Sequence, residues 1–249
     1  MIQFRKAVLA GLGVVGLLAG ASPVWAQAAP PAQPQAQTQT QIQAQAPGQT
    51  DAEKLQALNS AAVAVALGTQ PIPADQLALG GRFVKAMNIR AGLDETFKQA
   101  LAPARDMTLQ GLKNAPPEQK AKFMAALDDA LTDTRRDMVD KIIQGLDRYY
   151  AARLTAEQLT GALAFYESPL GQKTVRTPDA LTEAEKQEAG MTMMRNPAIL
   201  DVLGATIGSI ELSQSLSLRE VSGATERFKG RLCAALKPRG IASRGCPKA

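Results

Sequence analysis

Residues 116–150 read PPEQKAKFMAALDDALTDTRRDMVDKIIQGLDRYY, and this stretch decides the fold class. Its large apolar residues recur at steps of three, four or seven, with charged residues between them: Met124, Leu127, Leu131, Met138, Ile142, Leu146 and Tyr149. That spacing is typical of a helix that buries one apolar stripe, and Pro116-Pro117 supplies a start signal. We therefore expect a long amphipathic helix here.

Two other stretches show the same helical period. One precedes the quoted segment and comprises Leu93, Phe97, Leu101, Ala104, Met107 and Gly111. The other follows it, and we expect its members to form one buried stripe: Leu200, Leu203, Ile207, Ile210, Gln214, Leu218, Val221, Thr225, Phe228 and Leu232. Gly204 and Gly208 would let a neighbouring helix approach this third series closely. No alternating apolar run demands a strand, so we predict a single all-α, bundle-like domain over residues 51–249.

Proline-marked corners separate the shorter helices of this domain. Thr155 and Gln158 fit a capping box at the start of a helix. Ser168-Pro169 fits an N-cap followed by the first helical residue. Because the residue before proline disfavours the helical conformation, each such pair predicts a corner between packed helices. The same device recurs at Thr177-Pro178 and Asn196-Pro197.

The residues of this corner also resemble a known family. LTAEQL at 154–159 and FYESPLGQK at 165–173, followed by Pro178, are similar to the signature L-T-x-E-x-L … F-Y-x-S-P-x-G. That signature belongs to the bacterial exported family catalogued as domain of unknown function 2059, and the resemblance covers roughly residues 130–190. Gln158 stands where the family commonly has an acidic residue. The resemblance implies an exported, all-helical domain and implies no activity.

The start of the chain predicts export. Arg5 and Lys6 precede an uncharged apolar stretch at 7–21, and Val24 and Ala26 suit a signal peptidase that cuts after Ala26. The apolar stretch has 15 residues, whereas a membrane-spanning helix needs about 20. The alternative is an uncleaved membrane anchor. We expect a signal peptide at 1–26, a periplasmic or secreted protein, and no membrane span after cleavage.

Residues 27–50 have the composition of a linker. They contain nine Gln, six Ala, four Pro and no charged residue. Such a segment cannot bury enough apolar surface to offset the entropy of ordering it. We predict a disordered tether between the signal peptide and the helical domain.

Missing residue types exclude several kinds of active site. The chain has no His, which removes Ser-His-Asp and Cys-His nucleophiles and His-ligated zinc. Two Cys are too few for a four-thiolate metal site, and we find no P-loop or Rossmann glycine pattern. Carboxylate, Ser-Lys, Thr and Tyr chemistries remain. We expect no cofactor.

The charge of the chain is concentrated in its basic C-terminal segment, residues 227–249, which carries +7 without an acidic residue. This asymmetry could indicate an anionic envelope component as partner. The alternative is a solvated helix end, where cations complement the helix dipole. Export and the few aromatic residues disfavour a nucleic-acid partner.

Cys233 and Cys246 are the only cysteines. Disulfides persist in exported proteins, and the intervening Lys237-Pro238-Arg239-Gly240 can turn the chain back on itself. The spacing fits neither a CxxC redox motif nor a zinc motif. We favour a structural disulfide over a reactive or metal-binding pair.

Four aromatic residues around the corner admit two interpretations. Tyr149, Tyr150, Phe165 and Tyr166 could pack in the core, with Gly171 permitting close helix contact. They could instead line a groove for a peptide or glycan, because tyrosine offers both a stacking face and a hydroxyl.

Three further clusters admit a chemical interpretation. Glu167-Ser168 is similar to the catalytic pair of lytic transglycosylases, in which one carboxylic acid has a raised pKa, although the downstream signature is missing. Cu(I) could bind the thioethers of Met191, Met193 and Met194, which could equally fill gaps in the core. Ca²⁺ could bind Asp128, Asp129 and Asp133, which could equally form a solvated helix face.

Together these patterns favour a non-enzymatic helical protein that binds or scaffolds a partner in the envelope, either an envelope protein or an anionic envelope component. The alternative is a carboxylate-dependent peptidoglycan hydrolase that uses Glu167.

Overall fold

The computed structural model describes residues 51–241 and Cys246, and these residues form an all-α fold, as predicted. The signal peptide and the linker predicted at 1–26 and 27–50 lie outside the described residues. In chain order the helices are α2 (Asp51–Leu67), α3 (Ala74–Ala86), α4 (Ile89–Gly111), α5 (Pro117–Arg153), α6 (Ala156–Tyr166), α7 (Pro169–Arg176), η3 (Pro178–Ala180), α8 (Glu183–Arg195), α9 (Pro197–Leu236) and η4 (Lys237–Arg239). Within the described ranges, no helix combines the length and apolarity that crossing a membrane requires.

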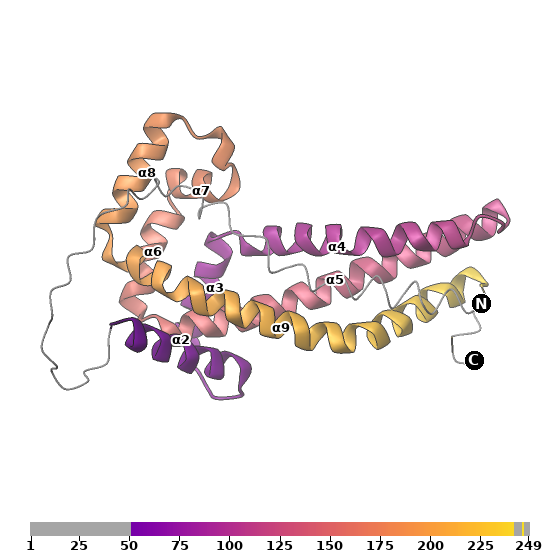
Figure 1. Cartoon of the computed structure of the whole chain (residues 1–249), viewed down its shortest axis with the longest axis horizontal. Helices are drawn as coiled ribbons and strands as arrows, with labels where there is room; N and C mark the ends of the chain where they lie inside the picture. The colour runs from indigo at the N-terminus through magenta and orange to yellow at the C-terminus, as the bar shows by residue number, and fades with distance from the viewer. Residues whose placement is uncertain (1–50, 242–245, 247–249) are drawn as a thin grey trace, which may run out of the picture.

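The helices are arranged as a head and a stalk (Figure 1). The head contains α2, α3, α6, α7 and α8, together with the C-terminal half of α5 and the N-terminal half of α9. The stalk contains α4 and the remaining halves of α5 and α9. With 37 and 40 residues, α5 and α9 are each about 55–60 Å long, so both run through head and stalk.

Each part has its own hydrophobic core. The head core is built around buried residues of α3, α5, α6 and α9, including Phe83, Ile142, Tyr149, Tyr166, Ile199 and Leu212. The stalk core joins α5 to the end of α9 through Met124, Leu127, Phe228, Leu232 and Leu236. The stripe predicted for residues 116–150 is confirmed, because six of its seven residues are buried and Leu131 is half-buried.

The predicted corner forms with its caps in place. Thr155 Oγ1 accepts a hydrogen bond from the Gln158 backbone N–H, and Gln158 Oε1 accepts one from the Thr155 N–H. Ser168 Oγ accepts from the Gly171 N–H at 3.0 Å, which starts α7. Asn196 caps α9 through the Ala198 N–H, whereas the Thr177 side chain makes no capping bond to η3.

A second capping box was not predicted from the sequence. Thr182 and Glu185 form it at the start of α8 with the same reciprocal hydrogen bonds as the first box. Lys173 Nζ also donates to the Glu185 carboxylate at 2.7 Å, and these contacts lower the pKa of Glu185 to about 2. The T-x-x-E pattern at 182–185 was the available signal.

Gly171 lies where no side chain fits. A Cβ atom at this position would lie 1.9 Å from the carbonyl oxygen of Phe165, which is backbone and cannot swing aside. The next residue, Gln172, donates from its side-chain amide to the carbonyl oxygen of Ala86 at 3.0 Å. The corner therefore fastens α7 to the ends of both α6 and α3.

The structure contradicts part of the third predicted stripe. Phe228 and Leu232 are buried as expected, but Leu200, Leu203, Ile207, Ile210 and Leu218 are exposed. The first half of α9 buries a different face, made of Ile199, Val202, Ala205, Ser209 and Leu212. Several residues on that face are small, so α9 can lie closer to its neighbours than its larger aliphatic face would permit.

We predict that Gly171→Ala destabilises the protein by about 3 kcal/mol, because backbone atoms must move to admit the methyl group. Gly190→Ala is the matched control, since a Cβ atom at this helical glycine of α8 would meet no atom within 4 Å. The control should stabilise by about 0.5–1 kcal/mol through helix propensity. Urea unfolding measures both variants, and equal effects would contradict the packing described for Gly171.

Candidate functional site

The most unusual surface of the described structure is a row of exposed aliphatic side chains on α9. We call it the outer stripe and define it as Leu200, Leu203, Ile207, Ile210 and Leu218. These side chains are 43–67% exposed, and they recur at helical spacing on the face opposite the core. Isolated exposed leucines are ordinary, but a row of aliphatic side chains, here interrupted by Gln214, is typical of an interaction site.

Two contacts beneath α9 fix the direction in which the outer stripe points. The Tyr149 hydroxyl donates to the carbonyl oxygen of Ala205 at 2.7 Å, and the Asn59 amide donates to that of Gly204 at 3.2 Å. A Cβ atom at Gly208 would lie 2.3 Å from the Tyr149 hydroxyl oxygen and 2.8 Å from Asn59 Cβ. The close approach predicted for Gly204 and Gly208 is therefore confirmed. The face of α9 that carries small residues, such as Ala205 and Ser209, packs against α2 and α5.

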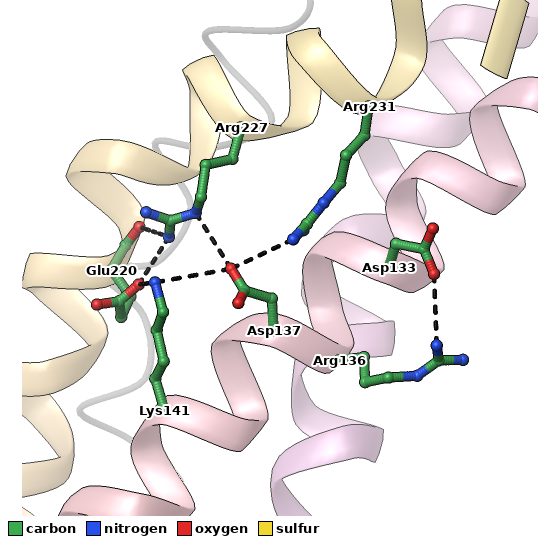
Figure 2. Close-up of polar contacts among 7 residues, drawn as sticks. All are labelled: Asp133, Arg136, Asp137, Lys141, Glu220, Arg227 and Arg231. Atoms are coloured by element: carbon green, nitrogen blue, oxygen red, sulfur yellow. Dashed lines mark hydrogen bonds and ion pairs between the residues drawn. The ribbon is translucent and has the colours of Figure 1, made fainter. Parts of the chain in front are cut away.

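A cluster of charged residues fixes α9 a second time, between the two cores (Figure 2). From α5, Asp137 and Lys141 reach across to α9, where they meet Glu220, Arg227 and Arg231. Asp137 Oδ2 lies 3.2 Å from Arg227 Nε and 3.5 Å from Arg231 Nη2. Glu220 Oε2 accepts from Lys141 Nζ at 2.9 Å and from Arg227 Nη2 at 2.7 Å. We call these five residues the stalk cluster.

Three of the seven basic residues of the C-terminal segment form ion pairs within the fold. Arg227 and Arg231 pair with Asp137, and Arg239 Nη2 lies 2.7 Å from Asp129 Oδ2. Three of the basic residues that suggested an anionic partner are thus paired with carboxylates of α5. These contacts favour the helix-end interpretation for the three arginines.

The predicted disulfide is present. Cys233 and Cys246 are bonded across 13 residues of sequence, with their Cα atoms 5.4 Å apart. Cys246 and Ile241 pack against the stalk core. The bond therefore ties the end of the chain to α9.

The four aromatic rings form part of the head core and line no groove. Tyr149, Tyr150, Phe165 and Tyr166 are at most 5% exposed. Their ring centroids lie 5.2 Å apart in the Tyr149–Tyr150 and Phe165–Tyr166 pairs, in edge-to-face geometry. Burial also raises the pKa of Tyr166 to about 12. The groove interpretation is therefore corrected, because the rings contact one another and the core instead of solvent.

Glu167 lacks the environment of a catalytic acid. Its carboxylate is exposed and accepts from Arg82 Nε at 2.6 Å, and this hydrogen bond lowers the pKa of Glu167. A general acid of a glycosidase needs the opposite shift. Burial raises the pKa of Asp147 to about 6, but that side chain lies against Gly81 at the packed contact of α3 with α5.

The aspartates considered as Ca²⁺ ligands lie next to arginines, and the methionines considered as Cu(I) ligands lie on α8. Asp128 accepts from Arg105 at 2.7 Å, Asp133 lies 3.5 Å from Arg136, and Asp129 pairs with Arg239. The three carboxylates thus each face an arginine. Met191 and Met194 on α8 are exposed at the surface of the head, whereas Met193 packs partly against the core.

Comparison with known proteins supports the family resemblance. A family model described as "Uncharacterized protein conserved in bacteria (DUF2059)" matches residues 140–196. This segment runs from the second half of α5 to the start of α9 and contains the whole corner. No curated protein and no solved structure matches the chain. The outer stripe follows directly after the matched segment.

We predict that Asp137→Ala destabilises the protein by about 2 kcal/mol, because it leaves Arg227 and Arg231 half-buried without their shared carboxylate. Asp133→Ala is the matched control one helical turn away. It removes a pair whose side chains are 66% and 56% exposed, and it should cost less than about 0.5 kcal/mol. Urea unfolding of both variants tests this, and an Asp133 effect as large as that of Asp137 would refute the role of the stalk cluster.

Proposed function

We propose that this chain is an exported, non-enzymatic helical protein of the bacterial cell envelope that binds a partner through the outer stripe of α9. The observation that carries the proposal is the stripe itself, five large aliphatic side chains in one row on a helix whose opposite face is packed. Exposure of these side chains to water is unfavourable, so a partner that covers them gains free energy.

The apolar gain from covering the stripe is modest. Full burial of one leucine or isoleucine contributes about 1.5–3 kcal/mol, so covering five half-exposed side chains contributes about 5 kcal/mol. The stripe is also preorganised, because Tyr149, Asn59 and the stalk cluster already hold α9 in place. A rigid surface loses little conformational entropy on binding.

Export is supported by two features of the chain. The sequence of residues 1–26 has the charge pattern, apolar stretch and small residues of a signal peptide. The Cys233–Cys246 bond suits an oxidising compartment. The family matched at 140–196 is described as conserved in bacteria, which supports a bacterial envelope as the setting. We propose a periplasmic or secreted location, with cleavage after Ala26.

The non-enzymatic part of the proposal is supported by the chemistry of the available groups. The sequence contains no His, and Glu167 is paired with Arg82 in a way that favours its ionised form. The hydrolase alternative required that carboxyl to be protonated near neutral pH.

The test is photo-crosslinking in intact cells, with the photoreactive residue placed at Ile207. We expect a discrete crosslinked product from this position and none from Lys98, which is exposed on α4 in the stalk. Leu203→Gln should weaken the product at least about fivefold, because it introduces a polar group into the centre of the stripe. Circular dichroism should remain unchanged, since Leu203 is half-exposed.

Met194→Gln is the control substitution, because Met194 is 72% exposed but lies on α8 and outside the stripe. Export is tested by determining the N-terminal residue of the protein isolated from the same cells. We expect Gln27. That protein should show no tryptophan emission, because Trp25 is the only tryptophan. Equal crosslinking from Ile207 and Lys98 would overturn the proposed surface, and retention of Trp25 would overturn the proposed cleavage.

A further inference from the structure

We infer that the partner of the outer stripe is a second copy of this chain, paired with it as a parallel two-stranded coiled coil. This inference rests on the proposed function and names the partner of the same surface. Leu200, Ile207 and Gln214 occupy a positions of a heptad repeat, and Leu203 and Ile210 occupy its d positions.

The structure places this seam where a second helix could reach it. All five seam residues, including Gln214, are exposed, while Ala205 and Leu212 at the opposite f positions are fully buried. Helix α9 is thus packed on one side and free along the a/d seam. Such a seam is narrower than the apolar face of a globular helix and matches the contact that one partner helix makes.

The flanking residues permit two copies to approach. The e and g positions beside the seam are Gly204, Thr206, Glu211 and Ser213, so Glu211 is the only charged residue among them. In a parallel pair each g position faces the following e position of the partner, which sets Thr206 against Glu211. Two copies therefore meet without like charges in contact.

Gln214 favours a parallel orientation of the two α9 helices. In a parallel, in-register pair the two Gln214 amides face each other and can exchange hydrogen bonds. In an antiparallel pair centred on Ile207 and Ile210, each Gln214 faces a leucine, Leu203, and loses its hydrogen bonds to water. The parallel pair is therefore favoured.

Other occupants fit the seam less well. The segment 27–50 of the same chain offers one large aliphatic residue, Ile42, and cannot fill five seam positions. Residues 197–218 contain no Lys or Arg, whereas helices that bind anionic membrane surfaces carry such residues beside their apolar face. Asp201 and Glu211 would repel that surface.

The seam is short, so the pairing should be weak. From Leu200 to Gln214 the seam extends about 21 Å, and the a/d pattern lasts two heptads, fewer than the roughly three to four of an independent coiled coil. A stable complex buries about 800 Å² on each partner, more than one short helix face provides. We therefore expect a dimer that forms at micromolar or higher concentration and dissociates on dilution.

Sedimentation equilibrium of the mature chain, residues 27–249, tests the inference directly. We expect a monomer–dimer equilibrium whose Kd rises about tenfold or more in Ile207→Glu, because two carboxylates then meet at an a position. Met194→Glu places the same charge on an exposed residue of α8 and should leave Kd unchanged. A wild-type chain that stays monomeric to millimolar concentration would overturn the inference.

Cysteine crosslinking then tests the orientation, since the two native cysteines are already bonded to each other. Gln214→Cys should form a covalent dimer under mild oxidation. A mixture of Leu203→Cys with Gln214→Cys would form the mixed dimer preferentially only in the antiparallel pair, which would overturn the parallel arrangement.

Failure of the second-copy inference is distinguishable from failure of the proposed function. A monomeric chain that still crosslinks from Ile207 to a different protein overturns the second copy and keeps the stripe as a binding surface. A monomeric chain without a discrete crosslink from Ile207 overturns both.

Discussion

The hydrogen bond from the Tyr149 hydroxyl to the Ala205 carbonyl oxygen sets the rotation of α9 about its own axis. It forms only because Gly208 leaves room for the tyrosine beside the helix backbone. With that contact made, Ala205 and Leu212 must face the core and Ile207 must face outward. The fold, the outer stripe and the proposed pairing all depend on this one rotational setting.

The stalk cluster fixes the rotation of α9 at a second point, nearer the C-terminal end of the helix. Asp137 and Glu220 hold Arg227 and Arg231 between the two hydrophobic cores, where a charge without a partner would be costly. Because α5 supplies both Tyr149 and Asp137, one continuous helix fixes α9 at two points. This explains how a 40-residue helix can present one face to solvent along the head and bury Phe228 and Leu232 in the stalk.

Local signals in the sequence predicted most of the fold. The helical period predicted the burial of Met138, Ile142 and Leu146, and the capping residues predicted the starts of α6 and α7. The disulfide followed from the presence of two cysteines and the predicted export. These predictions succeeded because each depends on residues close together in the chain.

The face of α9 could not be predicted in the same way. This helix carries two helical stripes, one of large aliphatic residues and one that includes Ala205 and Ser209. Side-chain hydrophobicity favours burial of the first stripe, but close packing against Tyr149 and Asn59 selects the second. The stalk cluster was equally inaccessible, because Asp137 and Arg227 are 90 residues apart and meet only in the folded chain.

The rotation of α9 is tested most directly by thiol labelling of variants that each carry one introduced cysteine, at a protein concentration below the Kd of the proposed dimer. Ile207→Cys should react at the rate of a free thiol, and Val202→Cys, at a side chain 1% exposed, should be strongly protected until the protein unfolds. The native cysteines are bonded to each other, so they do not react with the label. The reverse result, with position 207 protected and position 202 reactive, would mean that α9 buries its large aliphatic face and would contradict the account.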